Sequence, residues 1–253
     1  INHSFDDTII RAYDIRGVYD KTLKDKDAQV IGNLFGLTVG NGKTVNVGYD
    51  GRKSSIQLKD NLIDGLLESG VNVNDIGLVP TPLLYFSCIH CNADGGVMVT
   101  GSHNPKNHNG FKIVLNNLPF YGVDLIKIKN KAKSFSLPKN NGKKKTIDLR
   151  ETYLKRLFKD LIQKRKINIV WDSGNGASGE IVKMISKRIC GTQKVLFDKI
   201  DGDFPNHHPD PSEPKNLEFC RNEILKNGFD VGIAFDGDGD RIGVVDNKGS
   251  IIS

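Results

Sequence analysis

The chain has 253 residues, of which 38% are hydrophobic and 26% are charged, a composition typical of a globular protein with one large or two ordinary domains. Its formal net charge of +6 suits anionic ligands, but no basic segment interleaved with aromatic residues argues for nucleic-acid binding. No stretch approaches the roughly 20 apolar residues of a membrane-spanning helix, and the first residues do not resemble a signal peptide. We therefore expect a cytoplasmic protein that binds neither nucleic acid nor membrane.

The first half of the chain predicts a βαβ unit. A short apolar strand at 45–49 is followed by a helix that opens at Ser54 or Ser55 and ends at Gly70. A second strand is expected at 71–76 and a third, apolar one at 95–99. Strands that alternate with helices favour a largely parallel sheet.

The second half repeats this pattern after a polar, turn-rich segment at 137–146. We place the domain boundary at about residue 148, which gives one domain at 1–148 and a second at 149–253. The fold class predicted is α/β, with two consecutive domains that each contain a mostly parallel mixed sheet and helices on both faces. The elements expected in the second domain are a helix at 149–162, a strand at 167–171, a helix through 181–185, strands at 194–197 and 231–235, and a strand, turn and returning strand at 244–252.

A serine loop follows the third strand of the first half. Thr100-Gly101-Ser102-His103-Asn104-Pro105 contains a glycine that permits a sharp turn and a proline that fixes φ where the turn closes. Ser102 is expected at the carboxyl end of the strand, where open α/β sheets bind ligands, and His103 adds a polar group beside it. A polar turn with a capping serine would look the same, so the loop alone does not decide its function.

An acidic loop follows the strand at 231–235. Asp236, Asp238 and Asp240 alternate with glycines and precede Arg241. Carboxylates about 4 Å apart repel by roughly 4 kcal/mol at an effective dielectric constant near 20, so three of them favour a bound cation. Oxygen ligands alone favour Mg²⁺ or Ca²⁺, and the spacing excludes an EF-hand, because Arg241 stands where its glycine would be.

Other chemistries remain open alternatives. An aspartate-nucleophile phosphatase would also begin with a strand and Asp236-Gly-Asp238. The Gly174-x-Gly176-x-x-Gly179 pattern formally satisfies a dinucleotide-binding fingerprint, but a tight turn explains it better. Two minor candidates for a metal site remain. The Cys88-x-x-Cys91 pair lacks further zinc ligands, and we interpret the adjacent His207 and His208 as residues that pack within their loop.

Taken together, the motifs resemble the α-D-phosphohexomutase family, and most closely its bacterial phosphomannomutase/phosphoglucomutase members. The matching segments occur in order along nearly the whole chain. They are 13–17, 79–82, 100–105, 109–112, 172–176, 204–211 and 236–241.

The resemblance implies a mechanism and assigns roles to individual residues. Ser102 would carry a phosphoryl group and exchange it with a hexose 1-phosphate or 6-phosphate through a hexose 1,6-bisphosphate. Mg²⁺ would be held by Ser102, Asp236, Asp238 and Asp240. The resemblance also implies that Lys112 acts as the general acid/base and that His103 orients Ser102. Arg16 and Arg241 would stabilise the transferring phosphoryl group.

The resemblance also bears on the extent of the chain. Members of the family have four domains, and the motifs here account for the first two. We therefore expect a fragment without the sugar-reading and phosphate-gripping domains, weakly active or inactive alone, that acts on a phosphosugar as a monomer. Phosphoglucosamine mutase activity within the same family is the other alternative.

Overall fold

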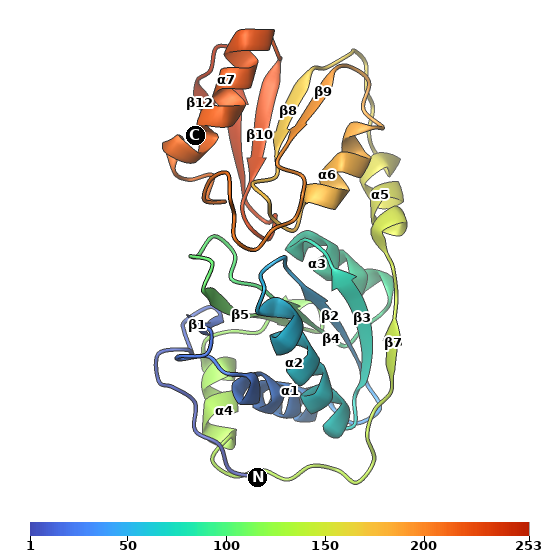
Figure 1. Ribbon diagram of the computed structural model, residues 1–253. Coiled ribbons are helices and arrows are strands. Elements are labelled where there is room, and N and C mark those ends of the chain that lie inside the picture. The colour runs from blue at the N-terminus through green and yellow to red at the C-terminus, as the bar shows by residue number, and fades with distance from the viewer. Residues whose placement is uncertain (253) are drawn as a thin grey trace. The chain divides into compact units, whose positions relative to one another are not determined.

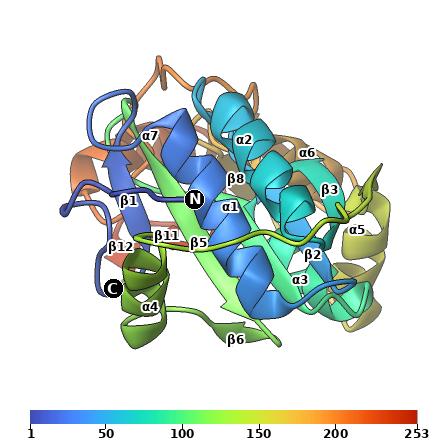
Figure 2. The same ribbon diagram turned by 90° about the horizontal axis from the view of Figure 1, so that it is seen from below.

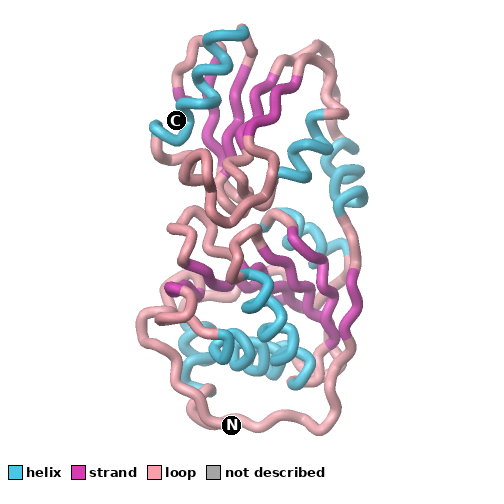
Figure 3. The backbone as a smooth tube through the Cα atoms, in the orientation of Figure 1, coloured by secondary structure: helices cyan, strands magenta, loops and turns pink. Residues whose placement is uncertain are grey.

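The computed structural model describes residues 1–252 and divides the chain into two compact units (Figures 1 and 3). The first unit contains residues Ile1–Gly101 and Lys106–Leu149. The second contains Ser102–Pro105 and Arg150–Ser253, so a four-residue piece of the serine loop belongs with the second unit rather than with its neighbours in sequence. Each unit is built around its own sheet.

The first unit has seven strands and four helices. In chain order these are β1 (Ile15–Val18), α1 (Asp25–Val39), β2 (Thr44–Tyr49), α2 (Ser55–Glu68), β3 (Asn72–Leu78), α3 (Thr81–His90), β4 (Gly95–Val99), β5 (His108–Leu115), β6 (Leu118–Pro119), α4 (Val123–Lys131) and β7 (Lys144–Thr146).

The sheet of the first unit is mixed and covered on both faces. The strand order is β1-β5-β4-β2-β3-β7, with β6 paired to β5. Strand β2 pairs parallel with β4 and β3, and β3 pairs parallel with β7. Strand β5 pairs antiparallel with both β1 and β4. Helices α1 and α2 lie side by side across one face (Figure 2). Helix α3 packs on the other face, where Ser87 accepts a hydrogen bond from Asn46 of β2.

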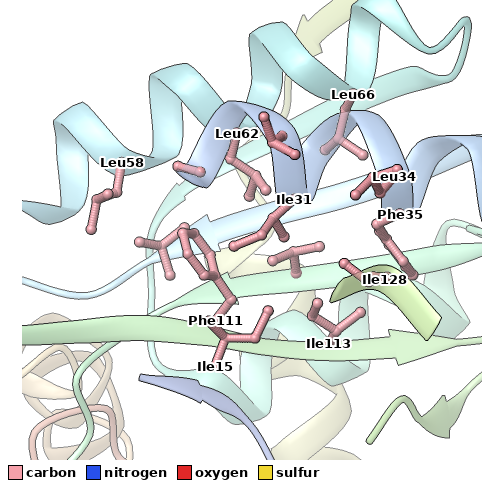
Figure 4. Packing of buried hydrophobic residues seen from close by; sticks show 14 of the residues in the cluster. Ile15, Ile31, Leu34, Phe35, Leu58, Leu62, Leu66, Phe111, Ile113 and Ile128 are labelled. Atoms are coloured by element: carbon pink, nitrogen blue, oxygen red, sulfur yellow. The ribbon is translucent and has the colours of Figure 1, made fainter. Parts of the chain in front are cut away.

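The main hydrophobic core lies between this sheet and helices α1, α2 and α4. Ile31 and Phe35 of α1 and Leu62 of α2 point towards Phe111 and Ile113 of β5 (Figure 4). The apolar positions recur at helical spacing, which explains why these segments form helices with one buried face. This core fixes the strands whose carboxyl ends carry the polar loops described below.

Up to residue 252, the second unit has five strands, three α-helices and a short 3₁₀ helix. In chain order these are α5 (Arg150–Lys159), β8 (Ile169–Asp172), α6 (Gly179–Ser186), β9 (Gln193–Leu196), η1 (Pro214–Leu217), α7 (Glu218–Asn227), β10 (Val231–Phe235), β11 (Ile242–Asp246) and β12 (Ile251–Ile252).

The second sheet has the order β12-β11-β10-β8-β9, in which β8 pairs parallel with both β9 and β10. Strand β8 alternates between its two faces: Val170 joins the core under α7, and Trp171 joins the core beside α6. Both units are therefore α/β layers with helices on both faces, as the sequence predicts.

Most expected elements occur with small shifts in their ends. Several other elements were not predicted, among them α1, β5, α4 and α7. Strand β7 lies inside the segment interpreted as a polar linker, where it pairs parallel with β3. Its three side chains are exposed, so no apolar alternation marks it in the sequence. Among the helices described, none is long and apolar enough to cross a membrane.

Candidate active site

The acidic loop forms a tight turn at the carboxyl end of β10. The Asp236 N–H donates to the Arg241 carbonyl at 3.2 Å, and the Gly239 N–H donates to the Asp236 carbonyl at 3.1 Å. The Arg241 N–H also donates to Asp236 Oδ1 at 3.1 Å. These bonds curl the loop so that one oxygen from each of Asp236, Asp238 and Asp240 lies within 4.8 Å of the others.

The electrostatics of this loop favour a bound cation. Asp236 and Asp238 are fully buried. Burial, followed by the negative charges of Asp238 and Asp240, raises the pKa of Asp236 to about 8. Three converging oxygen ligands are the donor set that hard divalent cations prefer, so these residues can hold a metal ion. Within residues 1–252 this is the only group of at least three potential ligands found.

Ser102 lies directly beside the acidic loop, within the second unit. Its Oγ donates to Asp236 Oδ2 at 3.0 Å and lies 3.3 Å from His103 Nδ1. The side chain is buried, and the backbone φ of +51° is uncommon for a residue that carries a Cβ. Unusual φ values of this kind occur preferentially at functional sites, where the surrounding structure imposes them.

Gly237 permits the close approach of these two segments. A Cβ at this position would stand 2.3 Å from the Ser102 carbonyl oxygen. Any side chain there would push the serine and the carboxylates apart, which explains the glycine that follows Asp236.

His103 is held from two sides. Its Nε2 lies 3.4 Å from Arg241 Nη1, and its carbonyl accepts a 2.6 Å hydrogen bond from His208 Nε2. The structure therefore brings together six of the eight site residues that the sequence predicts: Ser102, His103, Asp236, Asp238, Asp240 and Arg241.

The other two predicted site residues, Arg16 and Lys112, belong to the first unit. Arg16 lies on β1 opposite Gly110 of β5, and Lys112 is two residues further along β5. Because side chains alternate across a sheet, Arg16 and Lys112 share the face opposite that of Phe111, which points into the core. Arg16 also forms an ion pair with Asp14.

Three charged residues next to these loops were not singled out from the sequence: Asp50, Arg52 and Asp172. In the first unit, the buried Asp50 and Arg52 pair with each other and bond to the residues that flank the serine loop. In the second unit, the buried Asp172 accepts hydrogen bonds from His207 Nε2 at 2.9 and 3.1 Å. The signal that could have found them was the position of each aspartate at the end of a parallel strand.

Local packing accounts for the alternative sites that the sequence left open. A Cβ at Gly176 would meet the Gly237 carbonyl at 2.8 Å, and one at Gly179 would meet the Asp198 carbonyl at 2.1 Å, so close backbone packing requires these glycines. Burial raises the pKa of Cys88 to about 11, which disfavours the thiolate that a metal needs. His207 and His208 each bond to protein oxygens, as expected of loop packing.

Two family models match the chain. Residues 7–135 match phosphoglucomutase/phosphomannomutase alpha/beta/alpha domain I, and residues 151–249 match alpha/beta/alpha domain II. This chain belongs to the phosphoglucomutase/phosphomannomutase family. The resemblance inferred from the ordered motifs is thereby confirmed.

Individual members of the family support the assignment. A phosphomannomutase/phosphoglucomutase from Pseudomonas putida is 42% identical over 248 residues, covering 97% of this chain and 54% of that protein. A phosphoglucomutase from Neisseria meningitidis serogroup B is 41% identical over 250 residues, covering 96% of this chain and 54% of that protein. The chain therefore spans about half the length of the curated relatives it matches.

A solved structure agrees with the fold. The crystal structure of a phosphoglucomutase/phosphomannomutase family protein from Burkholderia thailandensis superimposes with a TM-score of 0.91 at 39% identity, covering 96% of this chain and 56% of that one. This agreement shows that the α/β architecture is that of the family.

Proposed function

We propose that this chain supplies the phosphoryl-carrying site of a phosphohexomutase, which interconverts hexose 6-phosphate and hexose 1-phosphate of mannose or glucose through a 1,6-bisphosphate. The observation that carries the proposal is the 3.0 Å hydrogen bond from Ser102 Oγ to Asp236, within a cluster of three carboxylates. A hydroxyl in that position can accept and release a phosphoryl group next to a cation site. The names of the relatives support the same activity.

The transfer step conserves atoms and charge. Starting from phosphoserine, the bond between phosphorus and Ser102 Oγ breaks, and a bond from phosphorus to the sugar hydroxyl oxygen forms. The hydroxyl proton passes to the neutral amine of Lys112, the departing Ser102 Oγ takes one proton from water, and Lys112 then returns its proton to water. When the bisphosphate has turned over, its other phosphoryl group returns to Ser102 by the reverse of this step.

Mg²⁺ is the proposed metal, held by Asp236, Asp238, Asp240 and an oxygen of the serine. When bound, it supplies positive charge that offsets the negative charge of the transferring phosphoryl group. The hydrogen bond from Ser102 to Asp236 keeps the hydroxyl at the edge of this cluster.

The remaining site residues are proposed to act on the phosphoryl group and on the serine. Arg16 and Arg241 offer guanidinium groups, which bind phosphate oxygens in a bidentate manner. His103 orients Ser102, which its Nδ1 approaches to 3.3 Å. Lys112 acts as the general acid/base for the sugar hydroxyl.

The larger context is proposed from the family. The domains are placed at 1–148 and 149–253, and the enzyme is expected to act on phosphosugars as a monomer in the cytoplasm. Because the chain spans about half of its relatives, turnover of a free sugar phosphate is expected to require the rest of such a protein.

The test is to incubate the chain with Mg²⁺ and glucose 1,6-bisphosphate and to map the phosphorylated peptide by mass spectrometry. We expect one phosphoryl group on Ser102 and none in Ser102→Ala. If an Asp236 acyl phosphate formed instead and Ser102→Ala still hydrolysed the bisphosphate, an aspartate-nucleophile phosphatase would replace the mutase proposal. Absence of any modification would also contradict it, provided that Mg²⁺ binding is intact.

A further inference from the structure

We infer that Asp50 and Arg52 form a buried clamp that fixes both ends of the serine loop and so positions Ser102 for phosphoryl transfer. The inference rests on the function proposed above and adds two positioning residues to it. All atoms of the clamp lie within the first unit.

Asp50 holds the residues that lead into the loop. Its Oδ2 accepts the Thr100 hydroxyl at 2.8 Å and the Gly101 N–H at 3.1 Å. Thr100 and Gly101 directly precede Ser102 in the chain, so the carboxylate fixes the backbone from which the serine projects. Its Oδ1 accepts the Ser55 hydroxyl at 2.5 Å and the Arg52 N–H at 3.0 Å, which fixes the carboxylate itself.

Arg52 holds the residue at which β5 begins, after the serine loop. Its Nε donates to Asp50 Oδ2 at 3.2 Å, and its Nη1 donates to the His108 carbonyl at 3.1 Å. His108 is the first residue of β5, so one guanidinium joins the start of the loop to its end. The planar fork of arginine allows both contacts at once, which a lysine cannot reproduce.

Gly101 shows how closely the clamp fits. A Cβ on this glycine would stand 2.4 Å from Arg52 Nε and 2.6 Å from the His108 carbonyl. The guanidinium therefore packs against bare backbone where the loop begins. No other residue type fits this position without displacing Arg52.

The burial of the pair argues for a specific role. The side chains of Arg52 and Asp50 are 0% and 1% exposed. Burying two charges carries a large desolvation penalty, and an apolar pair often stabilises a fold equally well or better. What the charged pair adds here is directional bonding to Thr100 and Gly101 after β4 and to His108 at the start of β5.

The experiment compares the rate of Ser102 phosphorylation by glucose 1,6-bisphosphate with amide hydrogen exchange in peptides covering residues 98–110. The informative pair is Thr100→Val, which removes only the hydroxyl bonded to Asp50, and Thr100→Ser, which keeps it. Asp50→Asn and Arg52→Lys perturb the clamp itself. Asp75→Asn is the matched control, because Asp75 is another buried carboxylate of the first unit and pairs with Lys59 and Lys144.

We expect Thr100→Val, Asp50→Asn and Arg52→Lys to slow phosphorylation at least tenfold and to increase exchange in the serine loop. Thr100→Ser and Asp75→Asn should stay within about twofold of wild type in both measurements. A double variant, Asp50→Asn with Arg52→Gln, removes both charges together. If it regains thermal stability without regaining the rate, the loss is one of positioning and not of folding.

The outcomes separate this inference from the proposed function. Slow variants with unchanged loop exchange, or an equally slow Asp75→Asn, would overturn the clamp while leaving the phosphoserine in place. If wild type itself is not phosphorylated, the proposed function fails, and the loop exchange of the same variants still decides whether the clamp exists.

Discussion

The imidazole of His208 donates a 2.6 Å hydrogen bond to the backbone carbonyl of His103, 105 residues earlier in the chain. The bond ties the 204–211 loop to the residue that follows Ser102. Both segments belong to the second unit, so the serine tip is fixed by two side chains, Asp236 at the hydroxyl and His208 at the adjacent backbone.

Replacing His208 by alanine should therefore slow phosphoryl transfer to Ser102. Loss of one neutral hydrogen bond is worth about 1 kcal/mol, or roughly a fivefold effect if the bond acts fully on positioning. The rate of Ser102 phosphorylation measures it, with His90→Ala as a control on an exposed histidine of α3 in the other unit. An unchanged rate in His208→Ala would show that the bond to His103 is dispensable.

Gly237→Ala should damage the site more than it damages the fold. The added Cβ would collide with the Ser102 carbonyl, and such overpacking costs about 1–3 kcal/mol. Mg²⁺ binding and Ser102 phosphorylation should both fall strongly. Gly228→Ala is the control, because Gly228 ends α7 with a φ of +68° and an added methyl group would meet no atom within 4 Å. This change should lower the free energy of unfolding by about 1 kcal/mol and leave the site intact.

Mg²⁺ should raise the melting temperature of the chain, because it relieves the repulsion among Asp236, Asp238 and Asp240. At a free concentration of 100 times its dissociation constant, a ligand that binds only the folded state adds about 2.7 kcal/mol. Chelation should reverse the shift. Asp238→Asn removes one charge from the cluster, so it should raise the stability of the metal-free chain and reduce the rise in melting temperature that Mg²⁺ causes. An undiminished rise would argue against a metal at these carboxylates.

Stability should also depend on the protonation of His207. Burial lowers its pKa, but the hydrogen bond and negative charge of Asp172 outweigh burial, so the pKa is raised in the folded state. The protonated form is thus favoured by folding, and this contribution is fully present below the unfolded pKa of about 6.5. It is lost as pH rises through the higher folded pKa.

Chemical denaturation as a function of pH measures this effect. The free energy of unfolding of wild type should decline above about pH 6.5 relative to that of His207→Gln, which cannot titrate. Parallel curves for the two proteins would contradict an ion pair between His207 and Asp172.

The sequence was most informative where hydrophobic pattern and turn chemistry agree. Strand β10 occurs at Val231–Phe235 as predicted, because five apolar or small residues stand directly before a turn rich in glycine. Strand β7 was missed, because an exposed Lys-Lys-Thr segment at a sheet edge carries no apolar signal and is ordered only by its pairing with β3.

The sequence indicated the residues that stand in short motifs but not the contacts between residues far apart in the chain. Ser102 and the three aspartates stand in short, unusual motifs, so the sequence singles them out as candidate site residues. Asp50 and Thr100 are 50 residues apart, and Asp172 and His207 are 35 apart. Their contacts depend on strand order, which periodicity along one chain does not specify.

The second unit is discontinuous in sequence, since Ser102–Pro105 is grouped with residues that begin at Arg150. A cut after Leu149 would leave Ser102 on one piece and the carboxylates of Asp236, Asp238 and Asp240 on the other. The tetrapeptide and the acidic loop therefore belong to one folding unit, although more than 130 residues of chain separate Ser102 from Asp236.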